Sequence, residues 1–166
     1  SQSGDLIVKR SDNGFTLNFP IWESLKSDME EPIIAQAFGK DATEIYKGKK
    51  WVLLFDDEDF IKNVQPDISL IKTIDSEGVV ISALSSDPDI DFVSRYFGPQ
   101  VGIDEDPVTG SAHCILTPIW ANKLNNTEFN ARQVSKRSGD LHLKLDGDRL
   151  HITGQAMLYL KGTITI

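Results

Sequence analysis

The sequence has only one cysteine, Cys114, in 166 residues, and it contains no apolar run long enough to cross a membrane. A single cysteine excludes an intrachain disulfide, so a reducing cytoplasm is the simplest setting for the chain. A membrane-spanning helix needs about 18 or more consecutive apolar residues, and no signal-peptide pattern opens the chain. We therefore expect a cytoplasmic protein that does not enter a membrane.

Basic residues are also scarce. The chain has 17 Lys and Arg against 25 Asp and Glu, which gives a net charge of −8. Non-specific nucleic-acid binding relies on clustered Lys and Arg, so we expect no nucleic-acid partner. The one dense charge run, Asp56–Asp59, is acidic and typical of a solvated helix start. Apolar residues make up 40% of the chain, as in ordinary soluble domains, and we expect a single domain over 1–166.

Short strand patterns occupy much of the chain. Phe15, Leu17 and Phe19 alternate with polar residues after the turn signal at 11–14, and Asp-Gly-Asp at 146–148 is a second turn signal. No internal repeat or low-complexity tract is present. We expect strands at 6–8, 15–19, 51–55, 79–84, 92–97, 129–134, 141–145, 150–153 and 156–166, and short helices at 32–38, 59–64 and 66–71.

One longer segment has the spacing of a buried helix. From Ala112 to Leu124, apolar residues recur at intervals of three and four. Cys114 and Ile119 widen the apolar surface, so the helix is expected to be buried on most sides. Pro118 should bend it, because proline removes one backbone hydrogen bond. We predict an α+β domain in which a curved, mostly antiparallel sheet is wrapped around this central apolar helix.

The loop before this helix carries the residues most suited to chemistry. Pro107 confines Asp106 to an extended conformation, where its carboxylate could brace the turn or move a proton. Gly110, Ser111 and Ala112 are small, so an anion could approach the unpaired amides of the helix start. The serine could equally cap the helix. An acid beside an anion site indicates acid/base chemistry on a carboxylate substrate.

Three other chemistries fit this segment less well. Ser111 and His113 lie two residues apart on a helix, where side chains point in different directions, and no Gly-x-Ser-x-Gly elbow is present. Cys114 could provide the thiol of a thiol-dependent racemase, but it lies one turn into the helix among apolar neighbours. The acids at 104–106 and His113 match neither a zinc nor a calcium spacing, so no metal is expected.

The same segment resembles a known family. Arg-Tyr-Phe-Gly-Pro at 95–99, Gly-Ile at 102–103 and Glu-Asp-Pro-Val-Thr-Gly-Ser-Ala-His at 105–113, followed by Leu116, Pro118 and Trp120, closely resemble the PhzF-like isomerases of phenazine biosynthesis. Segments 3–6, 135–141 and 154–166 resemble that family as well, with Ser138 in place of a glycine.

This resemblance implies the diaminopimelate-epimerase-like fold, in which two pseudo-symmetric domains flank a cleft. It also implies proton transfer beside a carboxylate without cofactor or metal. Asp106 would assist proton transfer, and Ser111 would act with the amides of Gly110 and Ala112 to hold the carboxylate of a small substrate. Thr109 and His113 complete the substrate-binding segment that the resemblance implies.

The chain also departs from the family. The catalytic glutamate motif, similar to Ser-Glu-Thr-Ala-Phe, and the histidine motif, similar to Cys-Gly-His-Ala-Thr, do not occur in it. The resemblance is therefore to the C-terminal half, and we expect that an N-terminal half or second chain completes the site. An exposed apolar cleft face would favour a homodimer. The alternative is a non-catalytic module that binds small acids or mediates an interaction.

Overall fold

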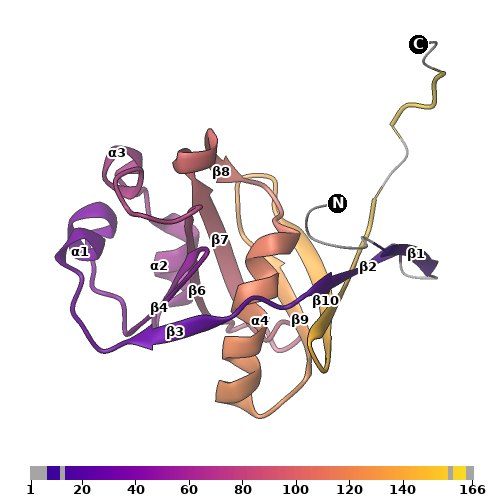
Figure 1. The fold of residues 1–166 in the computed structure, drawn as a ribbon, viewed down its shortest axis with the longest axis horizontal. Coiled ribbons are helices and arrows are strands. Elements are labelled where there is room, and N and C mark those ends of the chain that lie inside the picture. Colours follow the sequence, from indigo (N-terminus) through magenta and orange to yellow (C-terminus); the bar gives the residue numbers. More distant parts are fainter. Residues whose placement is uncertain (1–6, 12–13, 157–158, 164–166) are drawn as a thin grey trace.

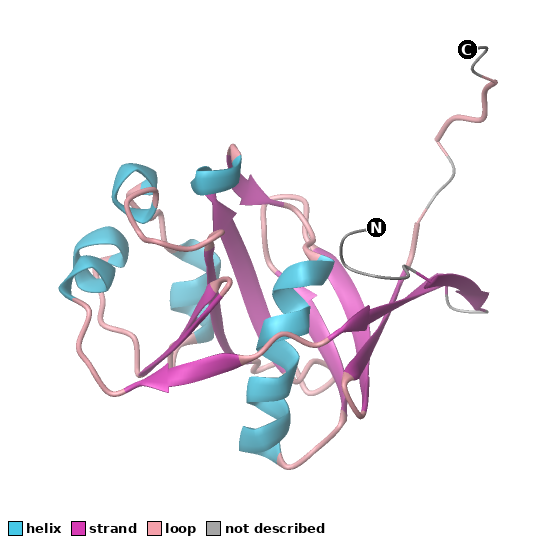
Figure 2. Ribbon diagram, in the orientation of Figure 1, coloured by secondary structure: helices cyan, strands magenta, loops and turns pink. Residues whose placement is uncertain are grey.

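The computed structural model describes residues 7–11, 14–156 and 159–163, which form an eleven-stranded sheet with helices on two sides (Figures 1 and 2). The strands are β1 (Ile7–Ser11), β2 (Gly14–Pro20), β3 (Ser24–Ser27), β4 (Glu44–Gly48), β5 (Trp51–Leu54), β6 (Val79–Leu84), β7 (Phe92–Gly98), β8 (Ile103–Asp106), β9 (Glu128–Gln133), β10 (Gly139–Asp146) and β11 (Arg149–Gly154). The helices are α1 (Pro32–Phe38), α2 (Glu58–Asn63), α3 (Ile68–Ile71) and α4 (Gly110–Leu124), and a 3₁₀ turn spans Pro99–Val101.

The sheet curls around α4. Its order is β1-β2-β11-β10-β9-β7-β6-β5-β4-β3, with β8 attached to β7. The pairs β5–β6 and β7–β9 are parallel, and the other described pairs are antiparallel. The chain runs directly from β2 into β3, across the front of α4 in Figure 1. Two distant strands of the sheet are thus joined by a short segment that crosses the helix.

Pro118 explains how this crossing segment is attached. A proline inside a helix cannot donate to the carbonyl four residues earlier, which here belongs to Cys114. The backbone N–H of Trp22, between β2 and β3, donates to that carbonyl instead at 2.9 Å. The hydrogen bond that α4 lacks is therefore replaced by one that ties the crossing segment to the helix.

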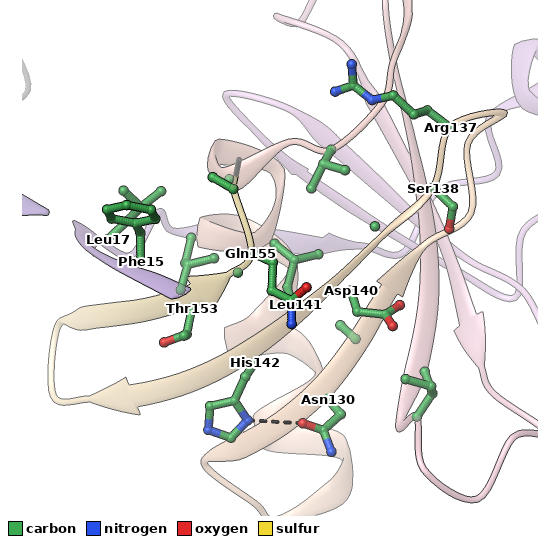
Figure 3. A pocket seen from close by; sticks show the side chains of 18 of the residues that line it. Phe15, Leu17, Asn130, Arg137, Ser138, Asp140, Leu141, His142, Thr153 and Gln155 are labelled. Atoms are coloured by element: carbon green, nitrogen blue, oxygen red, sulfur yellow. Dashed lines mark hydrogen bonds between the residues drawn. The ribbon is translucent and has the colours of Figure 1, made fainter. Parts of the chain in front are cut away.

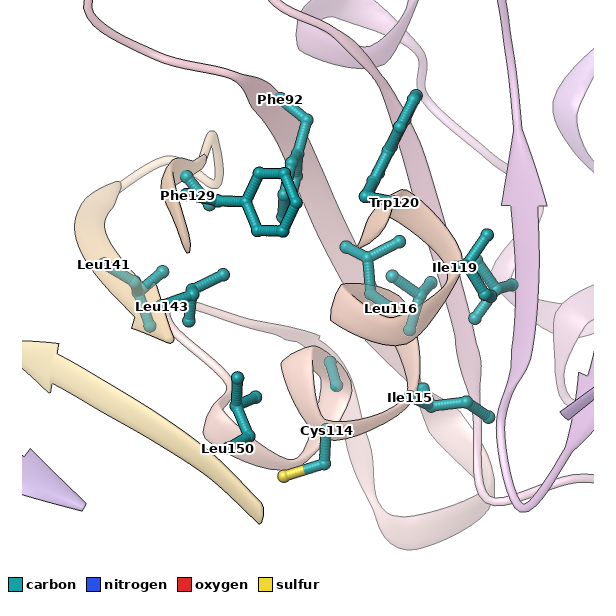
Figure 4. Close-up of a cluster of buried hydrophobic side chains, with 14 of the residues drawn as sticks. Phe92, Cys114, Ile115, Leu116, Ile119, Trp120, Phe129, Leu141, Leu143 and Leu150 are labelled. Carbon is teal, nitrogen blue, oxygen red and sulfur yellow. The ribbon is translucent and has the colours of Figure 1, made fainter. Parts of the chain in front are cut away.

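Strands β6 and β7 separate two hydrophobic clusters. Val80 and Phe92 pack with α4, whereas Ile81 and Phe97 pack with the helices on the opposite face. Trp120 of α4 stacks on Phe92 with the ring centroids 5.6 Å apart (Figure 4). The buried residues of α4 are Ala112, His113, Cys114, Ile115, Leu116, Thr117, Ile119 and Trp120. The helix is buried over most of its circumference, as its sequence predicts.

Local signals account for the ends of the helices. Gly39 ends α1 with a positive φ of 74°, which glycine adopts without strain. Asp57 caps α2 by accepting the N–H of Phe60, and Asp67 caps α3 in the same way. Asn125, with φ 50°, ends α4. Within the described ranges, none of the helices is both long and apolar enough to cross a membrane.

The predicted α+β fold, with a mostly antiparallel sheet around a central helix, is confirmed. Several boundaries differ. The central helix begins at Gly110 rather than Ala112, and α3 begins at Ile68 rather than Pro66, because Asp67 takes the capping position. Strands β3, β4 and β8 were not expected, so Asp106 ends a strand instead of lying in a loop. Residue 6 of the first expected strand and residues 12–13 of its turn lie outside the described ranges.

The strand expected at 156–166 is wrong for the residues that are described. Residue 156 and residues 159–163 form no strand, and Tyr159 is exposed. Gly154 pairs with Phe15, the second residue of β2, so the chain beyond β11 runs past the end of its neighbour. A strand forms only where a partner offers hydrogen bonds. The remaining residues of that segment lie outside the described ranges.

Candidate functional site

Asp106 is placed by the pairing of β8 with β7. Gly102, with a positive φ of 85°, turns the chain from the 3₁₀ segment into β8, and Asp106 lies opposite Tyr96 at the end of the pairing. Its side chain is half-buried. Burial, together with the nearby charges of Glu77 and Asp106, raises the pKa of Tyr96 to about 12, so that phenol stays protonated. Its hydroxyl donates to the backbone oxygen of Glu77 at 2.7 Å.

Thr109 occupies the capping position of α4 but does not cap it with its side chain. Its hydroxyl donates to Oδ2 of Asp106 instead. Its backbone N–H donates to Oε1 of Gln133 at 2.8 Å. Thr109 is itself buried, so its side chain faces Asp106 and the interior.

The first turn of α4 therefore starts without a side-chain cap. Gly110, Ser111 and Ala112 are its first three residues, whose N–H groups precede the hydrogen-bonded part of the helix. Gly110 lies against the Phe19 ring, where an added Cβ would come within 3.4 Å. Ser111 is half-buried and Ala112 is buried. A fifteen-residue helix with uncapped amides attracts an anion through its dipole.

His113 lies inside the protein and not at the surface of this turn. It is fully buried, and its Nδ1 lies 2.8 Å from the carbonyl oxygen of Thr109. A carbonyl only accepts, so Nδ1 carries the proton, and Nε2 accepts from the Ser94 hydroxyl at 3.4 Å. Burial lowers the pKa of His113 to about 4, so the ring is neutral near pH 7. Both ring nitrogens are occupied, and the geometry does not pair His113 with Ser111.

Cys114 is buried as well, and burial raises its pKa to about 11. Its Sγ contacts the carbonyl oxygen of Gly110 at 3.5 Å. A nucleophilic cysteine works as the thiolate, so this environment does not favour thiol chemistry. Among the described residues, nowhere do three or more His, Cys, Asp or Glu side chains gather closely enough to hold a metal ion.

A pocket of about 830 Å³ opens beside the start of α4. Gly110 and Val108 contribute to its lining, and the rest comes mainly from β2, β9, β10 and β11. Figure 3 shows Phe15 and Leu17 on one side, facing Ser138 and Asp140 on the other. The strand residues of this pocket were not predicted, because sequence alternation indicates which residues share a face but not which strands become neighbours.

A buried arginine fixes β8 from the opposite face of the sheet. Arg95 is 5% exposed and makes two hydrogen bonds to the Glu105 carboxylate, at 2.7 and 3.0 Å. Its third nitrogen donates to the backbone oxygens of Ile61 and Val64, at 3.1 and 2.7 Å. Because Glu105 precedes Asp106, the arginine anchors the strand that carries the candidate acid.

Comparisons with known proteins agree with this architecture. The family model described as phenazine biosynthesis-like protein (PhzC-PhzF) matches residues 11–162. A Halalkalibacterium halodurans protein named as an uncharacterized isomerase is 36% identical over 169 residues, covering 100% of this chain and 63% of the relative. One from Pseudomonas aeruginosa with the same description is 37% identical over 164 residues, covering 99% and 62%.

A solved structure is similar over the same extent. The crystal structure of a PhzF-family phenazine biosynthesis protein from Enterococcus faecalis aligns with a TM-score of 0.90 at 36% identity, covering 100% of this chain and 63% of that chain. The present chain thus spans less than two thirds of the length of each of these three proteins.

Proposed function

This chain belongs to the phenazine biosynthesis-like family, and on that basis we propose that it forms part of a cofactor-independent isomerase or epimerase. The proposed reaction moves a proton on a carbon next to the carboxylate of a small substrate. Two of the relatives carry the name isomerase, which supports this class of reaction. Catalysis is proposed to require a second element that supplies the principal base.

One observation carries the proposal: the uncapped first turn of α4 begins shortly after Asp106, and the Thr109 hydroxyl joins the two. The amides of Gly110–Ala112 would hold the substrate carboxylate, with the Ser111 hydroxyl as a further donor. When a carbon next to a carboxylate loses its proton, negative charge spreads onto the carboxylate oxygens. Fixed N–H donors stabilise that charge as it develops.

Asp106 would then exchange a proton with the substrate from one side. A base or acid must come within about 2.6–3.2 Å of the group it serves, and a carbon that inverts or isomerises needs a second group on another side. The family resemblance assigns that role to a glutamate motif that is absent from this sequence. We propose that another segment or chain supplies the glutamate across the Gly110 end of the pocket.

The anion site can be tested on the chain alone. Titration with acetate, followed by amide NMR, should shift Gly110, Ser111 and Ala112 before other residues, because their N–H groups point at the bound carboxylate. Chloride at equal ionic strength is the control for non-specific charge effects. Shifts that begin elsewhere on the chain would refute the carboxylate site.

The reaction can be tested by deuterium incorporation into candidate small acids in deuterated water. We expect little exchange by the chain alone and clear exchange once a segment with the glutamate motif is added. Asp106→Asn should abolish that exchange, whereas Asp104→Asn, on the exposed part of the same strand, should not. Strong exchange by the isolated chain would contradict the need for a second element, and full activity of Asp106→Asn would remove Asp106 from the mechanism.

A further inference from the structure

We propose that Gln133 is a positioning residue of this site, which acts through Thr109 to set the orientation of the Asp106 carboxylate. The inference rests on the proposed function, because it concerns the same proton transfer. Gln133 lies at the end of β9, far from the motif in sequence, and it is not among the site residues that the sequence predicts.

Gln133 occupies a core position. Alternate residues of β9 point toward α4, and the two before it, Phe129 and Ala131, are apolar and buried. Gln133 is 0% exposed. Burying an amide costs free energy unless its hydrogen bonds are made. The partners of this amide therefore show what holds it there.

All the hydrogen bonds of this side chain go to the loop that precedes α4. Oε1 accepts the N–H of Thr109 at 2.8 Å, and Nε2 donates to the backbone oxygen of Asp106 at 2.7 Å. Nε2 also donates to the Thr109 hydroxyl at 3.2 Å. The orientation of the amide is unambiguous, because a backbone N–H only donates and a backbone carbonyl only accepts.

This arrangement determines the direction of the next hydrogen bond. Since Nε2 can only donate, the Thr109 hydroxyl accepts from it and directs its own proton to Oδ2 of Asp106. Oδ2 is then occupied by a donor, and Oδ1, which takes no part in this chain of bonds, is the oxygen left to exchange a proton with substrate. The same bond keeps the Thr109 hydroxyl away from the α4 amides, which stay available for the carboxylate.

Thr109 thereby acquires a role different from the substrate contact that the resemblance implies. Its hydroxyl is the link between Gln133 and Asp106. Loss of a substrate contact raises KM, whereas loss of carboxylate orientation lowers kcat, because a misplaced acid still permits binding. The two roles can be separated by kinetics.

The test measures deuterium exchange by the chain recombined with a segment that carries the glutamate motif. We expect Thr109→Val, which keeps the shape of the side chain but lacks the hydroxyl, to lower kcat about 10- to 100-fold with little change in KM. Thr109→Ser should restore kcat. A raised KM with unchanged kcat, or equal losses in both variants, would overturn the proposal.

Gln133→Met should reproduce the loss of kcat. The double variant with Thr109→Val should be no slower than the slower single variant, since both act on the same carboxylate oxygen. Multiplied losses in the double variant would contradict an effect through Thr109. Gln100→Met is the matched control, because the Gln100 amide also donates two hydrogen bonds, to the backbone oxygens of Ile71 and Ile74, but on the opposite face of the sheet. It should leave kcat unchanged.

The two levels of the proposal fail differently. Absence of exchange in the recombined wild type overturns the proposed function and, with it, the kinetic role of Gln133. Exchange by the wild type with unaltered kcat in Gln133→Met and Thr109→Val overturns the positioning role alone. If Gln133→Met does not fold, the comparison of Thr109→Val with Thr109→Ser still decides whether the Thr109 hydroxyl orients Asp106. In both variants the Gln133 amide keeps its bonds to the backbone N–H of residue 109 and to the backbone oxygen of Asp106.

Discussion

The two faces of β6 and β7 differ in what they bury. The face toward α4 includes Ser82 and Ser94 among its apolar residues, and each meets a polar group of the helix. Ser82 Oγ accepts the indole N–H of Trp120 at 3.0 Å, and Ser94 bonds to His113. On the opposite face, the inward side chains of β6 are the apolar residues Val79, Ile81 and Ala83.

This difference bears on function. Apolar packing is non-directional, so the apolar positions of the face that contacts α1–α3 can be filled by any side chains of suitable volume, and Arg95 is the buried residue of β7 there that needs particular partners. Hydrogen bonds are directional, and those at Trp120 and His113 fix the rotation and the axial position of α4 against the sheet. The site uses the first three amides of that helix, so their placement depends on the polar contacts of its buried face. On the other face of the sheet, Arg95 is connected to the site by its ion pair with Glu105, the residue before Asp106.

Removal of Trp120 should have the largest effect on stability. Trp120 is 3% exposed and stacks on Phe92. We expect Trp120→Ala to lower the free energy of unfolding by about 3–5 kcal/mol, the range for deleting a large buried aromatic side chain. Trp120→Phe keeps most of the packing and should cost about 1–2 kcal/mol through the lost bond to Ser82. Denaturant unfolding measures both, and a loss under about 1 kcal/mol for Trp120→Ala would contradict its core position.

Protonation of the buried His113 should lower the free energy of unfolding in mild acid. Its pKa is lowered to about 4 by burial, against about 6.5 in an unfolded chain. As pH falls from about 6.5 to about 4, the unfolded state binds a proton that the folded state does not, so stability is lost across this window. The loss should approach about 3 kcal/mol and level off below about pH 4.

The measurement is the free energy of unfolding between about pH 7 and about pH 4.5. Burial raises the pKa values of Glu44 and Glu58, but their hydrogen bonds outweigh it and lower both to about 2. The stability that the protein loses when these two groups are protonated is therefore lost mostly below that range. His113→Asn should remove the slope within it. The same substitution at exposed His142 controls for the loss of a histidine, and a slope that persists in His113→Asn would assign it to another group.

The sequence predicts the burial of α4 better than it predicts the hydrogen bonds of the candidate site. The spacing from Ala112 to Leu124 indicates a buried helix because apolar periodicity records burial directly. Strand β3 was missed because Ser-Leu-Lys-Ser has no sustained alternation, and it forms only by pairing with β4. Capping propensity identifies Thr109 as the residue before a helix, but it does not predict that the Thr109 hydroxyl donates to Asp106. One feature of the sequence could have identified Gln133: it is a polar residue at a strand position where the alternation predicts an inward side chain.

Substitution of Arg95 would disturb the face of β6 and β7 that lies away from α4. Arg95→Met keeps much of the side-chain volume but leaves two backbone oxygens and Glu105 without their donor. We expect a loss of about 2 kcal/mol, below that of a fully buried ion pair because water can reach Glu105. The acetate-induced shifts at Gly110–Ala112 should persist, because α4 is held by its own face. Abolished shifts in a folded Arg95→Met protein would show that the two faces are coupled more tightly than their contacts indicate.

The smallest effect is expected for Pro118→Ala. A proline in a helix interior usually costs about 3 kcal/mol, partly through the hydrogen bond it removes. Here the Cys114 carbonyl already accepts the N–H of Trp22, so that part of the cost is offset. The backbone N–H gained at position 118 would share this carbonyl, and we expect a gain in stability below about 1 kcal/mol. The amide of Trp22 should exchange faster with solvent, because its acceptor is now shared. A gain near the full cost of about 3 kcal/mol, with unchanged Trp22 exchange, would mean that the crossing segment does not depend on the proline.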